Sequence, residues 1–394
     1  MANLYFFTMW YPFKEGAEAF IENELPIASE YFDKIFIAPM TAEGSQRAIP
    51  SNAYVLQPPF SKKRDIIVSG LKGLNHNTIV RLVNDVIKTK SWRSLTAFKS
   101  HIIQYLIFSG LRNSKTLRDI LNHLKKDDIL YSYWGNGWGT VITSFNDLQN
   151  KRICRFHRFD LYVDRSNKQL FRDCTLQNLD LGVFISQHGL EYEQKSYPSI
   201  PFNAIVSHLG TLNHGIARKS SDGKLRIVSC SRLSSIKRVD LIFKALLDLN
   251  NTEIEWTHLG GGDLFDELKQ LVDTTPHNFS VNLVGNLSNQ DVLNYYSTHP
   301  VDLFINVSSS EGLPVSIMEA ISFDIPIIAT NVGGTSEIVN EETGKLISGN
   351  PSTNEICEAI KEVMDRRYSA RKYWEKYFDA RRNYITFYNL LRDL

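Results

Sequence analysis

The second half of the chain alternates apolar runs of strand length with segments of helical periodicity, and this alternation is the strongest constraint on its fold. Runs that are apolar at successive positions are typical of strands buried on both faces of a parallel sheet. Segments of helical length separate them, as crossover helices do. We therefore predict a doubly wound α/β domain with strands at 225–230, 254–259, 280–284, 303–307, 325–329 and 345–347.

The first half carries a looser form of the same pattern. A strand at 3–10, a helix at 17–29 and a strand at 34–39 predict a βαβ opening. Residues 65–108 are mostly helical in pattern and rich in Lys, Arg and Trp. The chain therefore reads as two Rossmann-like α/β domains, the first with further strands at 53–57, 128–134, 151–157 and 181–186.

A length of 394 residues accommodates two domains of ordinary size. Residues 197–211, with two prolines and little periodicity, are typical of an interdomain connection. We predict a first domain at 1–203 and a second at 204–371. The aromatic segment 372–394 is expected to form a C-terminal helix that crosses back to the first domain.

Composition excludes several classes of protein. The formal net charge is +1, but residues 1–200 carry 25 Lys and Arg against 19 Asp and Glu. This modest excess does not favour nucleic-acid binding. The chain has no run of eighteen apolar residues, and its four cysteines have no zinc-ligand spacing. We expect a cytoplasmic protein with reduced thiols and no metal site.

An anion site is predicted where the strand at 303–307 runs into a helix. Pro314 suits the first turn of that helix, because its fixed φ is already helical. The amides of Gly312, Leu313 and Val315 then point out of the positive end of the helix.

Two glutamates accompany this anion site. Glu311 stands at its mouth, and Glu319 follows eight positions later, about two helical turns in. Carboxylates beside an anion site fit a ligand with phosphates in its middle and hydroxyls at both ends, such as a nucleotide diphosphate sugar. The alternative is that Glu311 caps the helix and Glu319 is a solvated helix residue.

Two further stretches follow strands of the second domain. Arg232 and Lys237 flank a turn after the strand at 225–230, where two cations can neutralise a diphosphate. Gly261 lies in a triple-glycine turn after the next strand, which permits close approach of a ligand or serves as a plain tight turn. A surface basic pair is the alternative for Arg232 and Lys237.

These elements, in this order and spacing, resemble the retaining glycosyltransferases of family 4, which have the two-domain GT-B fold with a cleft between the domains. Segments 11–16, 131–134 and 155–162 resemble a branch that builds bacterial capsule or O-antigen polysaccharides. The resemblance is specific over the second domain, where it rests on Arg232 with Lys237, 259–262, 283–285, Glu311 with Glu319, and Gly333-Gly334-x-x-Glu337.

The resemblance implies transfer of a sugar from a nucleotide diphosphate sugar to a glycan or polyprenyl-linked glycan, with retention and without a metal or other cofactor. Glu311 would hold the sugar hydroxyls and Glu319 the ribose hydroxyls. Arg232 and Lys237 would bind the diphosphate and support its departure. The amides of Gly312, Leu313 and Val315 would contact sugar and phosphate.

In the first domain the resemblance implies two further positions. His157, at the end of a strand, would face the donor and contact the sugar; a buried structural histidine is the alternative. Gly16 would let its loop approach the phosphates. Glu15, Ser231 and Arg238 stand where the family often has glycine. We expect Ser231 and Arg238 to alter turn freedom only, whereas Glu15 would repel a diphosphate.

Two other enzyme classes share such domains. A GT-B-like sugar-nucleotide epimerase remains the alternative, although that class lacks the paired cations and glutamates. A Rossmann redox enzyme needs a G-x-G-x-x-G fingerprint, which Gly16 alone does not supply.

The basic helical segments 61–72 and 81–108 lead to one hypothesis about location. They carry Lys62, Lys63, Arg64, Trp92 and Arg93, among other cations. Such segments are suited to peripheral contact with an anionic membrane surface that holds a lipid-linked glycan.

Overall fold

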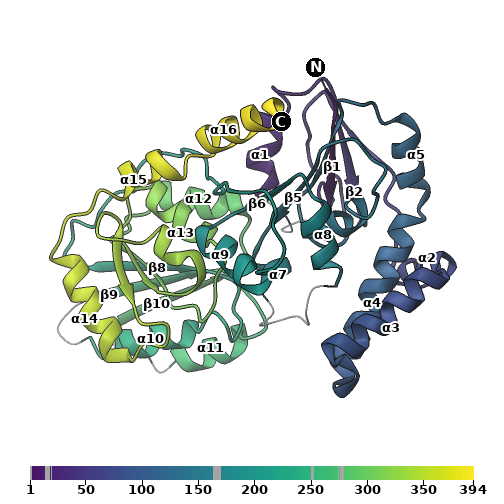
Figure 1. Cartoon of the computed structure of the whole chain (residues 1–394). Coiled ribbons are helices and arrows are strands. Elements are labelled where there is room, and N and C mark those ends of the chain that lie inside the picture. Colours follow the sequence, from purple (N-terminus) through teal and green to yellow (C-terminus); the bar gives the residue numbers. More distant parts are fainter. Residues whose placement is uncertain are drawn as a thin grey trace. The chain divides into compact units, whose positions relative to one another are not determined.

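The computed structural model describes residues 2–13, 18, 20–162, 170–249, 253–273, 275 and 279–394. The chain divides into two compact units. The first comprises Met1–Ser207 with Tyr384–Leu394, and the second comprises His208–Asn383. Each unit is built on one parallel sheet flanked by helices (Figure 1). Both sheets confirm the predicted α/β fold class.

The sheet of the first unit has seven strands in the order β3-β2-β1-β4-β5-β6-β7. The order reverses between β1 and β4, so this is the topological switch point, beside which parallel sheets bind ligands. The strands are β1 (Leu4–Thr8), β2 (Ile35–Pro39), β3 (Ala53–Val55), β4 (Ile129–Ser132), β5 (Arg152–Phe156), β6 (Leu181–Phe184) and β7 (Ala204–Val206).

The helices of the first unit include a long group at 63–112 that the first-half pattern predicted as mostly helical. The elements are α1 (Ile21–Ala28), α2 (Lys63–Gly73), α3 (His76–Thr89), η1 (Ser91–Arg93), α4 (Leu95–Arg112), α5 (Lys115–His123), α6 (Trp138–Ile142), α7 (Arg158–Leu161), α8 (Arg172–Asn178) and α9 (Gln187–Ser196).

The last helix, α16 (Ala380–Asp393), returns to the first unit, as the sequence predicted. The Tyr388 hydroxyl donates to the buried carboxylate of Glu24 at 2.7 Å, and the ring of Phe387 packs on Tyr131. These buried contacts explain why the segment is aromatic: its apolar face completes the core of the first sheet.

A buried cation lies under this helix. The Arg155 guanidinium donates to the Tyr131 hydroxyl at 2.6 Å and lies over the ring of Phe387. Its charge is balanced by the Glu24 carboxylate at 3.8 Å. A buried charge is stable only with such partners, and this network fixes the end of β5.

The sheet of the second unit has six strands in the order β10-β9-β8-β11-β12-β13, with its switch point between β8 and β11. The strands at 225–230 and 254–259 have the predicted bounds, and their central residues are buried. The strands are β8 (Leu225–Cys230), β9 (Ile254–Leu259), β10 (Phe279–Gly285), β11 (Leu303–Asn306), β12 (Ile327–Thr330) and β13 (Gly344–Ile347).

Helical segments separate the strands of the second unit, as the alternation predicted. After β12 the segment is only a 3₁₀ turn, η2 (Gly333–Glu337), because its two glycines form a tight turn against the preceding loop. The others are α10 (Val239–Leu247), α11 (Phe265–Val272), α12 (Asn289–Thr298), α13 (Val315–Ser322), α14 (Thr353–Met364) and α15 (Ala370–Tyr377).

The unit boundaries differ from the expected ones. Residues 204–206 form β7, which pairs with β6 in the first sheet, so the first unit extends to Ser207. The prolines near 200 had indicated an irregular connection there. The returning segment starts at Tyr384 instead of 372, because α15 packs against α13 in the second unit.

Among the described residues, no helix combines the length and apolar character needed to cross a bilayer.

Candidate functional site

The loops that follow β8 and β11 meet at the switch point of the second sheet. The Ser309 amide donates to the Ile236 carbonyl at 2.8 Å, which holds the two loops together. The predicted residues Lys237 and Glu311 lie on these two loops. A switch point is where the loops after neighbouring strands leave in opposite directions and open a crevice.

Lys237 and Glu311 form a direct ion pair. The Lys237 Nζ lies 2.5 Å from Glu311 Oε1, and the Asn306 Nδ2 donates to the same oxygen at 3.3 Å. Both charged side chains are mostly shielded from solvent. The structure thus brings together two groups that are 74 positions apart in sequence. A short charge-assisted bond of this kind holds both groups in fixed positions.

The start of α13 provides the predicted amides. Pro314 directly precedes the helix as its N-cap residue, one position before the first turn in which it was expected. In the described part of the chain, the amides of Gly312, Leu313 and Val315 donate to no protein acceptor. They are therefore available to an anion at the positive end of the helix.

Gly333 sets the position of this loop. Its φ is +55°, and a Cβ there would lie 1.9 Å from the Glu311 carbonyl oxygen. The next amide, that of Gly334, donates to the Gly312 carbonyl at 2.7 Å. Only glycine permits both the backbone conformation and this approach, so the turn after β12 supports the Glu311 loop from behind.

Glu319 is buried on α13, with 6% of its surface exposed. Burial raises the pKa of its carboxyl to about 7, although an Asn289 Nδ2 hydrogen bond at 2.6 Å acts in the opposite direction. No cation pairs with it among the described residues. Glu319 is therefore no solvated helix residue, and the alternative reading of this position is wrong.

Cys230, at the end of β8, links Glu319 to Lys237 in space. Burial raises the pKa of its thiol, Glu319 raises it further, and Lys237 lowers it. Both charged groups thus act on the end of the same strand. The carboxyl of Glu319, the cation of Lys237 and the free amides of α13 share the carboxyl-terminal edge of the sheet.

Arg232 and Gly261 lie beside this edge, but both make contacts with residues outside the Lys237–Glu311 pair. The Arg232 Nη2 contacts both oxygens of Asp263, at 2.9 and 3.2 Å, and its side chain is 69% exposed. The Gly261 amide donates to Asn286 Oδ1 at 3.1 Å. The Gly261 carbonyl accepts from the Leu233 amide, so the two turns support each other.

Arg238 does more than alter turn freedom, contrary to our expectation. Its φ is +48°, the left-handed region that glycine favours. Its guanidinium also donates to the carbonyls of Val307, Ser308 and Gly349. The arginine thereby ties the loop after β8 to the loop after β11, which sequence reasoning did not foresee.

In the first unit, His157 follows β5 and lies in an aromatic enclosure. Its ring packs against Phe20, Tyr133 and Trp134 at centroid distances of 4.6 to 5.6 Å. Burial, aided by the nearby Arg155 charge, lowers its pKa well below the ordinary value. Among the described residues, neither buried ring nitrogen has a hydrogen-bond partner. A neutral imidazole with two unused polar atoms is unusual in a protein interior.

Two carboxylates that the sequence did not single out as structural hold the loops around His157. Glu18 accepts from the amides of residues 9, 10 and 11, and from the Trp134 indole at 2.5 Å. Asp160 accepts from the amides of His157 and Gly135. Burial raises the pKa of Asp160 to about 6. Gly16 and Glu15 lie outside the described residues.

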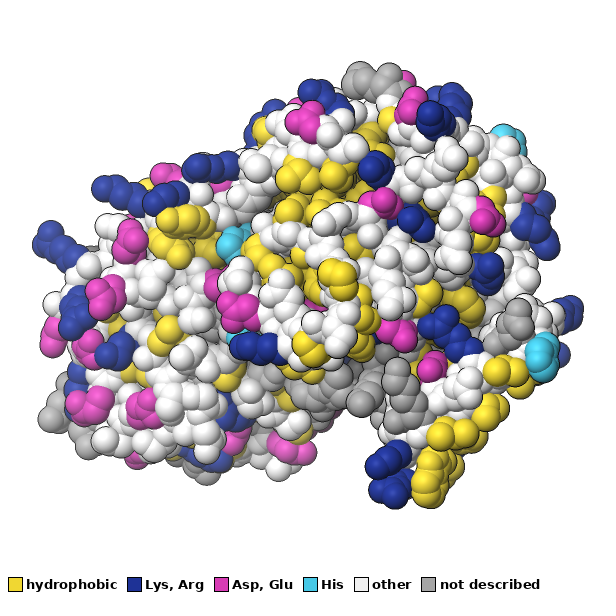
Figure 2. Space-filling view, viewed as in Figure 1, with side chains coloured by type: hydrophobic (Ala, Val, Ile, Leu, Met, Phe, Trp, Pro, Cys, Tyr) yellow, Lys and Arg dark blue, Asp and Glu magenta, His cyan; other side chains and the backbone are white. Residues whose placement is uncertain are grey.

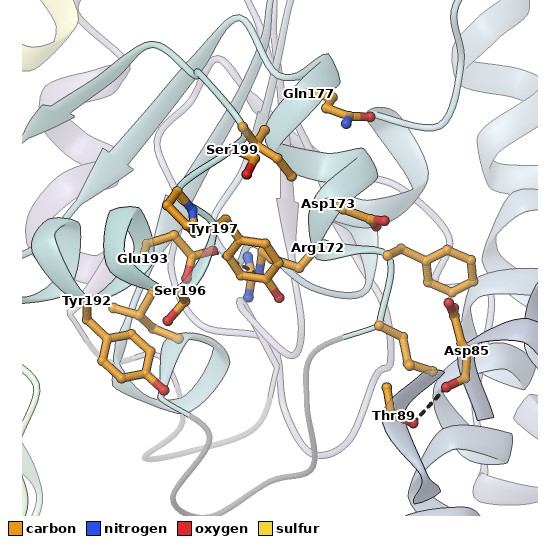
Figure 3. A pocket seen from close by; sticks show the side chains of 15 residues that line it. Asp85, Thr89, Arg172, Asp173, Gln177, Tyr192, Glu193, Ser196, Tyr197 and Ser199 are labelled. Atoms are coloured by element: carbon orange, nitrogen blue, oxygen red, sulfur yellow. Dashed lines mark hydrogen bonds and ion pairs between the residues drawn. The ribbon is translucent and has the colours of Figure 1, made fainter. Parts of the chain in front are cut away.

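The first unit also contains a cavity of about 750 Å³ that the sequence did not predict. Asp85 and Thr89 of α3 lie across it from Tyr192 and Ser196 of α9 (Figure 3). Arg172 and Glu193 form an ion pair at 3.2 Å in its wall, so their charges cancel. The rest of the lining is mixed. It combines aliphatic side chains and the carboxylate of Asp173 with the aromatic, amide and hydroxyl groups of Phe171, Gln177, Tyr197 and Ser199.

Comparison with known proteins adds an independent line of evidence. Residues 216–381 match the family model for glycosyl transferases group 1. The chain is 30% identical over 140 residues to the O-antigen biosynthesis glycosyltransferase WbnH of Escherichia coli, covering 36% of this chain and 38% of WbnH. It is 24% identical to the amylovoran biosynthesis glycosyltransferase AmsK of Erwinia amylovora, covering 86% of this chain and 84% of AmsK.

Solved structures agree on the fold. The apo form of the lipopolysaccharide outer core galactosyltransferase WaaB superposes with a TM-score of 0.69 at 14% identity, covering all of both chains. Anabaena Alr3699/HepE in complex with UDP-glucose gives a TM-score of 0.59 at 15% identity, covering 99% of this chain and 100% of that one. Residues 216–381 are therefore similar to the glycosyl transferases group 1 family, in a chain whose two Rossmann-like domains have the fold of the GT-B structures.

Proposed function

We propose that this chain transfers a sugar from a nucleotide diphosphate sugar to a glycan or lipid-linked glycan in the biosynthesis of a cell-surface polysaccharide, as a retaining enzyme of family 4. The observation that carries the proposal is the Lys237–Glu311 pair, held at 2.5 Å beside the free amides of α13. The names of the O-antigen and amylovoran relatives support the polysaccharide context.

The donor would bind at the edge of the second sheet. Its diphosphate would accept hydrogen bonds from the amides of Gly312 and Leu313 and pair with Lys237. A helix N-terminus and a cation both favour the binding of an anion. Glu311 would then exchange its lysine partner for sugar hydroxyls. One solved relative of the fold holds UDP-glucose, which supports a nucleotide-sugar donor here.

Glu319 would accept hydrogen bonds from the ribose hydroxyls. Its buried carboxyl has a pKa of about 7 and no cation partner among the described residues, so it gains from hydroxyl donors. Binding would favour its ionised form and release a proton.

The chemical step requires stabilisation of the departing nucleotide. Charge develops on the diphosphate as the glycosidic bond breaks, and Lys237 is placed to offset it. Arg232 can contribute after it releases Asp263. These side chains and the helix end supply the positive charge, and on this basis we propose metal-independent catalysis, which predicts that EDTA leaves the rate unchanged. His157 remains our proposed ligand for the donor sugar, supported by its two unpartnered ring nitrogens.

The acceptor side is a proposal for the first unit. Its cavity presents aromatic faces together with hydroxyl, amide and carboxylate groups, which suit the ring faces and hydroxyls of a sugar. Tyr197→Ala is then expected to raise the KM for acceptor while leaving the KM for donor unchanged.

The proposal is tested with a panel of nucleotide sugars and glycan acceptors. We expect acceptor-dependent release of the nucleoside diphosphate, and a product whose anomeric configuration, measured by NMR coupling constants, equals that of the donor. Inversion would remove the retaining assignment. Interconversion of the donor sugar without an acceptor would support the epimerase alternative, which the comparisons do not favour.

A further inference from the structure

The helices α2, α3 and α4 expose an unusual number of large apolar side chains. Of the twenty such side chains in the described structure, eleven lie between residues 67 and 103. Isolated exposed apolar residues are ordinary, but a concentration of this kind marks an interaction surface. We call these residues the apolar face: Ile67, Val68, Leu71, Ile79, Val80, Val83, Ile87, Trp92, Leu95, Phe98 and Ile103.

The apolar face follows the helices in regular rows. On α3, Ile79, Val83 and Ile87 are four positions apart, so they lie on one side of the helix. Figure 2 shows a row of apolar side chains along the helices at its lower right, with basic side chains beside it.

The apolar face is not needed for packing among α2, α3 and α4 themselves. Helices α2 and α4 already pack closely, because a Cβ at Gly70 would lie 2.6 Å from the Leu106 carbonyl oxygen. In the carboxyl-terminal half of α4, the side chains of Tyr105, Leu106 and Leu111 are buried. The apolar face therefore lies on surface that this packing leaves uncovered.

Positive charge surrounds the apolar face. Residues 62–99 contain nine Lys and Arg against two Asp and Glu, a formal charge of +7 in a chain whose total is +1. Both acids are engaged locally: Asp65 accepts from the amide of Lys62, and Asp85 accepts from the Tyr105 hydroxyl. The exposed cations, none of which pairs with a carboxylate in the described part of the chain, are Lys62, Arg64, Lys72, Lys90, Arg93 and Lys99.

We propose that the apolar face docks onto an anionic lipid bilayer. Apolar rows flanked by cations match the two layers of such a surface, since the acyl boundary takes the apolar groups and the headgroups take the charges. Trp92, whose ring lies against the Arg93 guanidinium, has the amphipathic character that favours the headgroup region.

Two other partners for the apolar face, a second copy of the chain and a nucleic acid, fit its groups less well. A second copy of the chain would bring two segments of charge +7 together, which opposes association. A nucleic acid would satisfy the cations but leave the eleven apolar side chains without a partner. An anionic bilayer satisfies both sets of groups. This docking does not depend on the proposed transferase activity.

The test is flotation of the full chain with vesicles of phosphatidylcholine alone or with 30% phosphatidylglycerol. We expect binding to the anionic vesicles that Ile87→Ser weakens on the order of fivefold. Lys90→Gln with Arg93→Gln should weaken it about 30-fold, at roughly 1 kcal/mol per cation. Quenching of Trp92 fluorescence by brominated lipid, read against Trp92→Phe, reports insertion.

Matched control variants separate docking from loss of folding. Ile216 is 64% exposed, like Ile87 at 63%, but lies in the second unit, so Ile216→Ser should leave vesicle binding unchanged. Lys125→Gln with Lys126→Gln is the matched control for the two cations. Equal losses in the control variants, or no difference between the two vesicle types, would overturn the proposal. So would a dimer that Ile87→Ser dissociates, or a folded chain that does not bind vesicles.

Discussion

The two units hold their candidate groups in opposite electrostatic states. In the second unit the groups are charged and engaged: Lys237 pairs with Glu311, and Arg232 pairs with Asp263. In the first unit the candidate group is a neutral imidazole, His157, with no partner among the described residues. Under the proposed function, the second unit would bind the charged phosphates and the first unit would bind an uncharged group.

The same difference appears in similarity to known proteins. The family model matches 216–381, which lies wholly within the second unit (His208–Asn383) and includes no part of the first unit. Under the proposed function, the second unit would bind a diphosphate at a helix end, which is a common type of anion site. The first unit would bind the acceptor with loops, which vary more among proteins than the elements they connect.

The largest expected effect comes from removing the charge at the switch point. Lys237→Met should lower kcat/KM by about 100-fold or more, corresponding to roughly 3 kcal/mol of leaving-group stabilisation. Lys244→Met is the matched control, because Lys244 also pairs with a carboxylate, Asp240, at 2.7 Å but lies along α10. If kcat/KM of Lys237→Met and Lys244→Met differed by less than threefold, Lys237 would not be the residue that binds the phosphates. Steady-state kinetics with the preferred donor measures both.

Glu319 gives the next largest effect and a dependence on pH. Its folded pKa of about 7 lies above its ordinary value of 4.5. The folded state thus binds more protons between these values, and its stability from this group is lost as pH rises through 7. Glu319→Gln should therefore gain stability relative to the parent between pH 5 and pH 8, on the order of 1–3 kcal/mol in urea unfolding.

The same substitution should lower nucleotide affinity on the order of tenfold, because it removes a charged acceptor for the ribose hydroxyls. In the parent, affinity should rise from pH 6 to pH 8, with proton release measured by calorimetry in buffers of different ionisation enthalpy. Affinity that is independent of pH would separate Glu319 from the ribose. Glu358→Gln, an exposed residue on α14, serves as the control.

His157→Phe tests whether the first unit contributes an uncharged ligand. We expect activity to fall on the order of tenfold through one lost hydrogen bond, while stability is maintained because the two unpartnered nitrogens are removed. The depressed pKa of His157 means that its contribution to stability is lost as pH falls below its ordinary value of 6.5. The variant should therefore lose less stability between pH 7 and pH 5. Unchanged activity would leave His157 with a structural role only.

Arg232→Ala should have the smallest effect, a few-fold rise in donor KM with little change in kcat, because an exposed pair contributes little. Asp263→Asn should move KM in the opposite direction, since it frees Arg232. Equal effects of Arg232→Ala and Lys237→Met would contradict the ranking.

The helices that carry the apolar face show where a sequence pattern alone is ambiguous. The spacing of Ile79, Val83 and Ile87 predicts an amphipathic helix equally well whether its apolar side faces a core or a bilayer. The solvent exposure of these three side chains decides between a core and a bilayer. That exposure depends on which helices pack on α3. The basic residues had already indicated a membrane surface, but the apolar rows became visible only after folding.

The sequence by itself determined the parallel sheet of the second unit, the proline at the start of α13 and the positions of Lys237 and Glu311. Strand periodicity, proline φ and loop placement are local properties that neighbouring residues set. Only the tertiary structure decided that Lys237 and Glu311 touch, that Arg238 ties two loops, and that Glu319 is buried without a cation in the described residues. Ion pairs and burial arise between residues far apart in sequence, so they depend on packing that no local pattern specifies.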